Sequence, residues 1–238
     1  VVAVDFGGGW YGTYHARQLL KACRAGRLNA RRVVVVDRNR DCRAARELGE
    51  EPLFRLAVAD WRRFLGGYLP QAPGDAHIVP APFTPHLFYE WLAASLEAAL
   101  GEGSVRREPC RLNLGLPYEQ PGPDGQLHLS YAPWLCPATC IEPALCPAIK
   151  GPKAWDLAEA VKAVAREPGI GVQEGAVVPC RHLAYGVGTV PARLLLGARE
   201  RLLGRARQEG SLRAAVATTS HCHGVMGLLT LSPRPRVG

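Results

Sequence analysis

The feature that most constrains the fold of this chain is a glycine pattern near its start. Gly7, Gly9 and Gly12 give the spacing G-x-G-x-x-G, with an apolar run before it and a helix-forming run over 13–25 after it. A second apolar run then ends on Asp37. This order of strand, glycine turn, helix and acid-ended strand is the context in which the motif predicts a dinucleotide-binding site.

Each glycine has its own physical role in such a turn. Gly7 permits the tight turn out of the strand, Gly9 lets the backbone approach a pyrophosphate, and Gly12 lets the helix pack close to the sheet. Trp10 and Tyr11 lie just before the helix expected over 12–26, whose N–H groups and positive dipole end favour a phosphate there. We therefore expect these five residues to contact a cofactor. A glycine-rich turn that binds nothing is the alternative.

The residues after the second apolar run bear on which cofactor binds. Asp37 is placed to accept hydrogen bonds from the adenosine ribose hydroxyls, and its carboxylate would repel the 2′-phosphate of NADP. Arg38 and Arg40 follow at once, and an arginine at this point can accommodate that phosphate. The acid favours NAD, and NADP is the alternative.

The chain beyond residue 75 carries a family resemblance. A strand is expected over 75–80, followed by Thr84-Pro85-His86 and a helix over 86–100. This order is similar to the strand, T-P-x-x-H turn and helix of the glucose–fructose oxidoreductase and inositol dehydrogenase family. Residues 99–109 also resemble the A-L-x-x-G-x-x-V-x-x-E-K-P segment of that family. The resemblance covers about residues 1–109 and implies an NAD(P)-binding Rossmann domain.

The same region supplies the candidate catalytic residue, His86. It is expected at the carboxyl edge of the sheet, where ligands bind in open α/β folds, and there it could face the nicotinamide as an acid or base. A histidine that contacts local backbone is the alternative. Pro82 and Thr84 are expected at the cofactor. The family's catalytic lysine is absent between Glu108 and Pro109, which argues against a sugar-dehydrogenase activity.

The second notable feature is a cysteine-rich segment. Cys136, Cys140 and Cys146 give C-x3-C-x5-C-P. Three thiolates that converge can bind an iron–sulfur cluster or zinc. Cys222 is the preferred fourth ligand, and the histidines on either side of it could also ligate or donate hydrogen bonds to a sulfur. An iron–sulfur cluster is favoured, and zinc or metal-free thiols are the alternatives.

Composition excludes several classes of function. The net charge is +8, but the arginines are spread along the chain. Since nucleic-acid-binding proteins gather basic residues on one face, no nucleic-acid partner is expected. No run reaches the roughly 18 apolar residues of a membrane helix, and no stretch reads as a secretory signal. We therefore expect no membrane insertion and a cytoplasmic location.

Together these features predict an α/β protein in three parts. A Rossmann-type parallel sheet over 1–109 is followed by a Cys/Pro-rich metal-binding segment over 110–153. A smaller α/β region over 154–238 ends with a final strand over 212–219.

The predicted function is an NAD(H)-binding redox protein with a cysteine-ligated metal site. Such a protein would be a subunit of a larger oxidoreductase complex, because a partner would have to supply the flavin that links two-electron to one-electron transfer. A non-catalytic NAD-sensing or assembly subunit with structural zinc is the alternative. A third, weaker reading is a small dehydrogenase that uses His86 and no metal.

Overall fold

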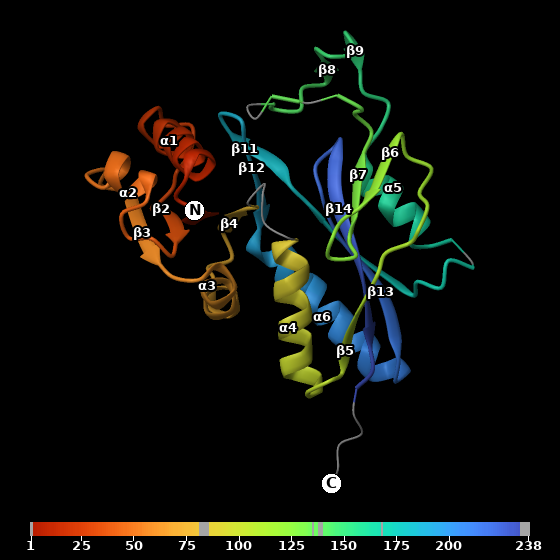
Figure 1. Ribbon diagram of the computed structural model, residues 1–238. Helices are drawn as coiled ribbons and strands as arrows, with labels where there is room; N and C mark the ends of the chain where they lie inside the picture. Colours follow the sequence, from red (N-terminus) through yellow and green to blue (C-terminus); the bar gives the residue numbers. More distant parts are fainter. Residues whose placement is uncertain (1, 81–85, 135, 138–139, 168, 234–238) are drawn as a thin grey trace. The chain divides into compact units, whose positions relative to one another are not determined.

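The computed structural model describes residues 2–80, 86–134, 136–137, 140–167 and 169–233 (Figure 1). The chain forms two compact units. The first comprises Val1–Leu87, Pro137–Pro143 and Cys180–Leu194, and the second comprises Phe88–Cys136, Ala144–Pro179 and Leu195–Gly238. Both units combine helices with sheets, so the chain is a mixed α/β protein, which agrees with the predicted α/β class at this coarse level. Among the described residues, no helix combines the length and the apolar character that a membrane span requires.

The first unit alternates strands and helices before a closing hairpin. Its elements are β1 (Val2–Phe6), α1 (Trp10–Arg24), β2 (Arg32–Asp37), α2 (Arg43–Leu48), β3 (Phe54–Val58), α3 (Trp61–Tyr68), the 3-10 helix η1 (Leu69–Gln71), β4 (Ala76–Val79), β11 (Arg181–Ala184) and β12 (Val187–Pro191). The sheet order is β11-β12-β4-β1-β2-β3. Strands β4, β1, β2 and β3 are parallel, and β12 joins β4 antiparallel.

The valine run of β2 explains why this strand lies inside the sheet. Val33, Val35 and Val36 are fully buried, as expected for β-branched residues of a parallel strand covered on both faces. Helix α1 presents the buried residues Leu19 and Leu20 to the same apolar cluster. This packing fixes the axis of α1 against the strands and so places its N-terminus beside the glycine turn.

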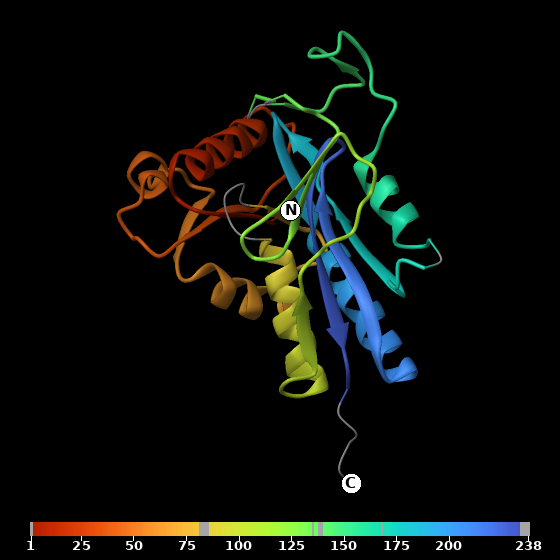
Figure 2. The same cartoon turned by 45° about the vertical axis from the view of Figure 1, so that its right-hand side comes forward.

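The second unit contains the remaining helices and a mixed sheet (Figure 2). Its elements are α4 (Leu87–Leu100), β5 (Val105–Glu108), β6 (Tyr118–Pro121), β7 (Leu127–Ser130), β8 (Leu145–Cys146), β9 (Gly151–Pro152), α5 (Leu157–Val164), β10 (Glu174–Pro179), α6 (Ala192–Glu209), β13 (Leu212–Thr219) and β14 (His223–Leu231). The first residues of α4 and α6 belong to the first unit. The sheet order is β10-β13-β14-β7-β6, with β5 also paired to β14.

Strand β14 is the centre of this sheet and was not predicted. The expected final strand over 212–219 is β13, and β14 follows it as a long antiparallel partner. Gly227 interrupts the apolar pattern of β14, because the ring of Tyr89 lies 2.5 Å from where a Cβ would stand. The Tyr89 hydroxyl donates to the carbonyl oxygen of Leu228 at 2.9 Å. The strand therefore depends on a tertiary contact that the local sequence does not reveal.

Helix α5 covers part of this sheet. Its buried residues Leu157 and Val161 belong to one apolar cluster with Leu129 of β7 and Leu228 of β14. The carboxylate of Asp156 caps the helix by accepting from the Ala158 N–H at 2.8 Å. The cap and the apolar face together fix the start of α5 near the turn that joins β13 to β14.

Candidate functional site

The three motif glycines of the turn between β1 and α1 differ in backbone conformation and in the space around them. Gly7 has a φ of +99°, which a residue with a side chain rarely adopts. A Cβ on Gly12 would stand 1.7 Å from the carbonyl oxygen of Gly7. A Cβ on Gly9 would meet nothing within 4 Å in the part of the chain that the structure describes. The first and third glycines thus shape the turn, and the second borders open space.

The N-terminus of α1 is the positive end of the helix dipole, and the side chains of its first turn do not offset this charge. Gly9 is the N-cap and supplies no side-chain cap, and the first turn contains no acidic residue. The first N–H of the helical ladder is that of Thr13, which donates to the Gly9 carbonyl at 3.0 Å. Lys21 and Arg24 in the last turn complement the other end of the dipole. This arrangement favours an anion at the start of α1.

Asp37 joins the end of β2 to the glycine turn. One carboxylate oxygen accepts from the Gly8 N–H at 2.6 Å, and the other accepts from the Asn39 N–H at 2.8 Å. A carboxylate oxygen has two lone pairs, so each keeps capacity for a further donor such as a hydroxyl. Gly8, which the motif leaves variable, is also required, because a Cβ there would lie 2.2 Å from the sulfur of Cys42.

Trp10, Tyr11 and Arg38 flank the predicted cofactor site, and each contacts another side chain. Trp10 is 54% exposed and stacks on Tyr14 with the ring centroids 5.7 Å apart, and its edge-to-face neighbour is Tyr11. Arg38 forms an ion pair with Asp60. Hydrogen bonding from Arg38 lowers the pKa of the Asp60 carboxyl. The guanidinium is therefore already paired with the carboxylate that caps α3.

A buried acid lies beneath the turn. Asp5, in β1, is 1% exposed. Its carboxylate accepts from the Phe6 N–H at 2.8 Å and lies 3.2 Å from Nδ1 of His15 in α1. Burial raises the pKa of Asp5, while the contact with His15 lowers it by a smaller amount. The acid is satisfied by a backbone group and a helix residue, which ties β1 to α1.

The predicted catalytic turn is only partly described. His86 is 4% exposed, at the entrance to α4. Pro82 and Thr84 lie outside the described residues, so their predicted contact with a cofactor stays a prediction. In this chain the histidine follows Pro85 directly, which is a shorter spacing than T-P-x-x-H.

The predicted metal ligands fall in both units. Cys140 belongs to the first unit, and Cys136, Cys146 and Cys222 belong to the second. The sulfur of Cys136 lies 3.4 Å from Nε2 of His223, and that of Cys222 accepts from the indole N–H of Trp155 at 3.4 Å. Within the described residues, no group of three or more His, Cys, Asp and Glu side chains is arranged to hold a metal ion. The four-cysteine site stays a prediction.

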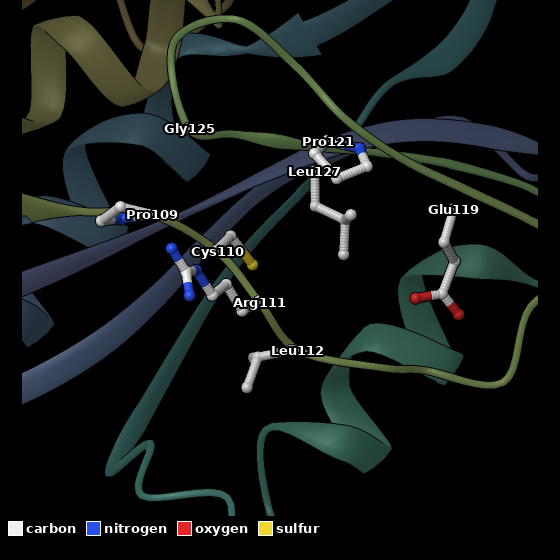
Figure 3. Close-up of a pocket in the computed structure, with 8 residues that line it drawn as sticks. All are labelled: Pro109, Cys110, Arg111, Leu112, Glu119, Pro121, Gly125 and Leu127. Atoms are coloured by element: carbon white, nitrogen blue, oxygen red, sulfur yellow. The ribbon is translucent and has the colours of Figure 1, made fainter.

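The second unit also contains a cavity of about 440 Å³ (Figure 3). Its lining residues are Pro109, Cys110, Arg111, Leu112, Glu119, Pro121, Gly125 and Leu127. The Glu119 carboxylate accepts from the N–H groups of Leu114 and Leu116 and so holds the adjacent loop. Burial raises the pKa of the Cys110 thiol. The acid and the thiol at this cavity thus serve the local fold and favour no particular reaction.

A comparison with known protein families finds a match for the second half of the chain. Residues 88–232 match a family model described as "Uncharacterized protein, C-terminal domain". No curated protein and no solved structure matches the chain. The matched region covers more than half of the sequence and begins in α4, after the glycine turn and its parallel strands. The chain therefore belongs to the AF_1314_C family.

Proposed function

We propose that the protein binds a dinucleotide of the NAD class at the glycine turn, in a first unit of Rossmann type. The observation that supports the proposal is that the three glycines have three different structural roles. One adopts a positive φ, one packs the helix against the turn, and the middle one borders open space. These are the three roles of the glycines in a dinucleotide-binding turn. The strand order β3-β2-β1-β4 also agrees with such a fold.

The residues that would hold the cofactor follow from the chemistry of its parts. The pyrophosphate suits the N-terminus of α1 beside Gly9, because the helix end is positive and lacks an acidic side chain. The adenosine ribose suits the Asp37 carboxylate, which retains lone pairs. NAD is favoured over NADP because Arg38, the arginine next to this acid, is paired with Asp60. NAD would supply hydride-transfer chemistry.

Two roles for a bound NAD follow from the sequence. In the first, the protein is a redox subunit of a larger oxidoreductase complex. In the second, it is a non-catalytic sensing or assembly subunit, and one contact favours this role. Glu108, where the family's E-K-P segment is matched, is held in the second unit by Arg213 at 2.9 Å and by the hydroxyl of Thr230. That acid serves the pairing of β5 with β14 rather than a reaction.

The test is NADH binding by wild-type protein and two glycine variants. Gly9→Ala places a methyl group in the open space where the pyrophosphate would approach, and Gly9 has a φ of -77°, which alanine tolerates. Gly66→Ala in α3 is the matched control, because a Cβ there also meets nothing within 4 Å in the described part of the chain. We expect Gly9→Ala to fold normally and to lose more than about tenfold in affinity, about 1.4 kcal/mol.

The control should bind NADH like the wild type, and NADPH should bind the wild type more weakly than NADH. Calorimetry and NADH fluorescence measure these affinities. Absence of NADH binding by the wild type, or equal binding by Gly9→Ala, would contradict the proposal. Added redox partners then distinguish the two roles, since only the redox subunit passes electrons from NADH to an acceptor.

A further inference from the structure

A histidine in the second unit has a defined tautomer. The Ser130 hydroxyl lies 2.8 Å from the carbonyl oxygen of Ala132, and it must donate there because a carbonyl only accepts. With its single proton given to that carbonyl, the hydroxyl accepts from Nδ1 of His223, 2.9 Å away, in the tautomer that is protonated at Nδ1. The lone pair is left on Nε2, which faces the sulfur of Cys136 at 3.4 Å.

This sulfur–nitrogen spacing fits two ligands of one metal ion. Zinc binds sulfur at about 2.3 Å and histidine nitrogen at about 2.0–2.1 Å, and a tetrahedral angle between these bonds separates the two atoms by about 3.5 Å. The observed 3.4 Å agrees with that value. In addition, metal-bound histidines usually donate their second N–H to a fixed acceptor, which is the role Ser130 fills here.

The adjacent cysteine has a different environment. Cys222 is buried, and its sulfur accepts from the Trp155 indole, which stacks on Tyr131 beside it. Cys222 lies in the bend before β14, and His223 is the first residue of that strand. His223, at the start of β14, is the residue of this turn that meets Cys136.

We propose that Cys136 and His223 are two ligands of a single tetrahedral metal ion of the zinc class. In a four-iron cluster each iron takes one protein ligand, whereas this pair has the spacing of two ligands on one ion. The site is independent of the dinucleotide proposal, because Cys136, His223 and Ser130 all belong to the second unit.

The first experiment is metal binding by the full chain, purified reduced and without oxygen. Zinc is titrated against a coloured chelator, and cobalt replaces zinc to report thiolate ligation and tetrahedral geometry in its visible spectrum. We expect one ion per chain. Ser130→Ala should weaken binding about 10–100-fold, as for loss of a residue that orients a ligand, and His223→Gln should weaken it further. Cys222→Ser is the matched control and should retain the metal.

The second experiment needs no variant. Iodoacetamide is applied to the wild type with and without zinc, and alkylated peptides are identified by mass spectrometry. Zinc should protect Cys136 by at least tenfold and leave Cys23, a partly exposed thiol of α1, unchanged. Equal alkylation of Cys136 with and without zinc would overturn the proposal. So would iron with acid-labile sulfide that depends on Cys222 but not on His223.

Discussion

Replacement of Gly12 by alanine tests whether the glycine turn and α1 pack as closely as the structure indicates. The new Cβ would stand 1.7 Å from the Gly7 carbonyl oxygen and 2.9 Å from its carbon. Both are backbone atoms, so no side-chain rotation relieves the overlap. The turn and the helix must instead separate, and Asp5 lies directly behind, with a carboxylate oxygen 3.6 Å from the same position.

The expected cost follows from this geometry. Overpacking of a well-packed site usually costs about 1–3 kcal/mol, and a clash with rigid backbone belongs at the upper end, about 2–3 kcal/mol. For a chain of this size each kcal/mol lowers the melting temperature by roughly 2–4 °C, so we expect a decrease of about 5–10 °C. Circular dichroism during heating measures the melting temperature of each variant.

Gly66→Ala is the control for the general effect of alanine in a helix. It lies within α3, where nothing in the described chain crowds a Cβ, and it should melt at or slightly above the wild-type temperature. If Gly12→Ala melted at the wild-type temperature, the close approach of α1 to the turn would be refuted. The assignment of the three glycine roles would then lose its structural basis.

Two further predictions concern ionisable groups of the first unit. Burial raises the pKa of Asp5 above its unfolded value, so its protonated form stabilises the fold at low pH and this contribution is lost as pH rises through the folded-state pKa. The melting temperature of Asp5→Asn relative to wild type should therefore rise between pH 4 and pH 7, and a constant difference would contradict the burial argument. Burial and the charge of Glu142 raise the pKa of Cys180 to about 12. Its thiol should resist iodoacetamide at pH 8 in the folded protein and react once urea unfolds the chain, as mass mapping would record.

The elements that sequence reasoning identified are those specified by local patterns. The valine run of β2 and the glycine spacing before α1 are short-range signals, and both elements lie where they were expected. Strand β14 was not predicted because Gly227 breaks its apolar run. A glycine is needed there because the ring of Tyr89, which is distant in the sequence, leaves no room for a Cβ. Local periodicity cannot record such a contact.

The candidate sites likewise combine short-range sequence signals with contacts between residues that are distant in the sequence. The spacing of Gly7, Gly9 and Gly12 could be read directly, but the need for Gly8 could not, because it arises from Cys42 and from Asp37, which lies 29 residues away. The Ser130–His223 contact spans 93 residues, and the contact of His223 with Cys136 spans 87. Sequence reasoning placed a metal ligand in this turn and favoured Cys222. In the structure, His223 at the start of β14 contacts Cys136, whereas the sulfur of Cys222, in the bend before this strand, accepts from the Trp155 indole.

Asp37 shows why the glycine variants test nucleotide binding better than variants of the acid do. The sequence assigned its carboxylate to a ribose, whereas in the structure it also fixes the turn through the Gly8 N–H and the next loop through the Asn39 N–H. Removal of the carboxylate would therefore release the turn whether or not a nucleotide binds there. A Cβ on Gly9 would meet nothing within 4 Å among the described residues, so a methyl group added there changes the space for a ligand and leaves the turn intact. Loss of NADH affinity in Gly9→Ala alone would consequently assign the open space beside α1 to the pyrophosphate.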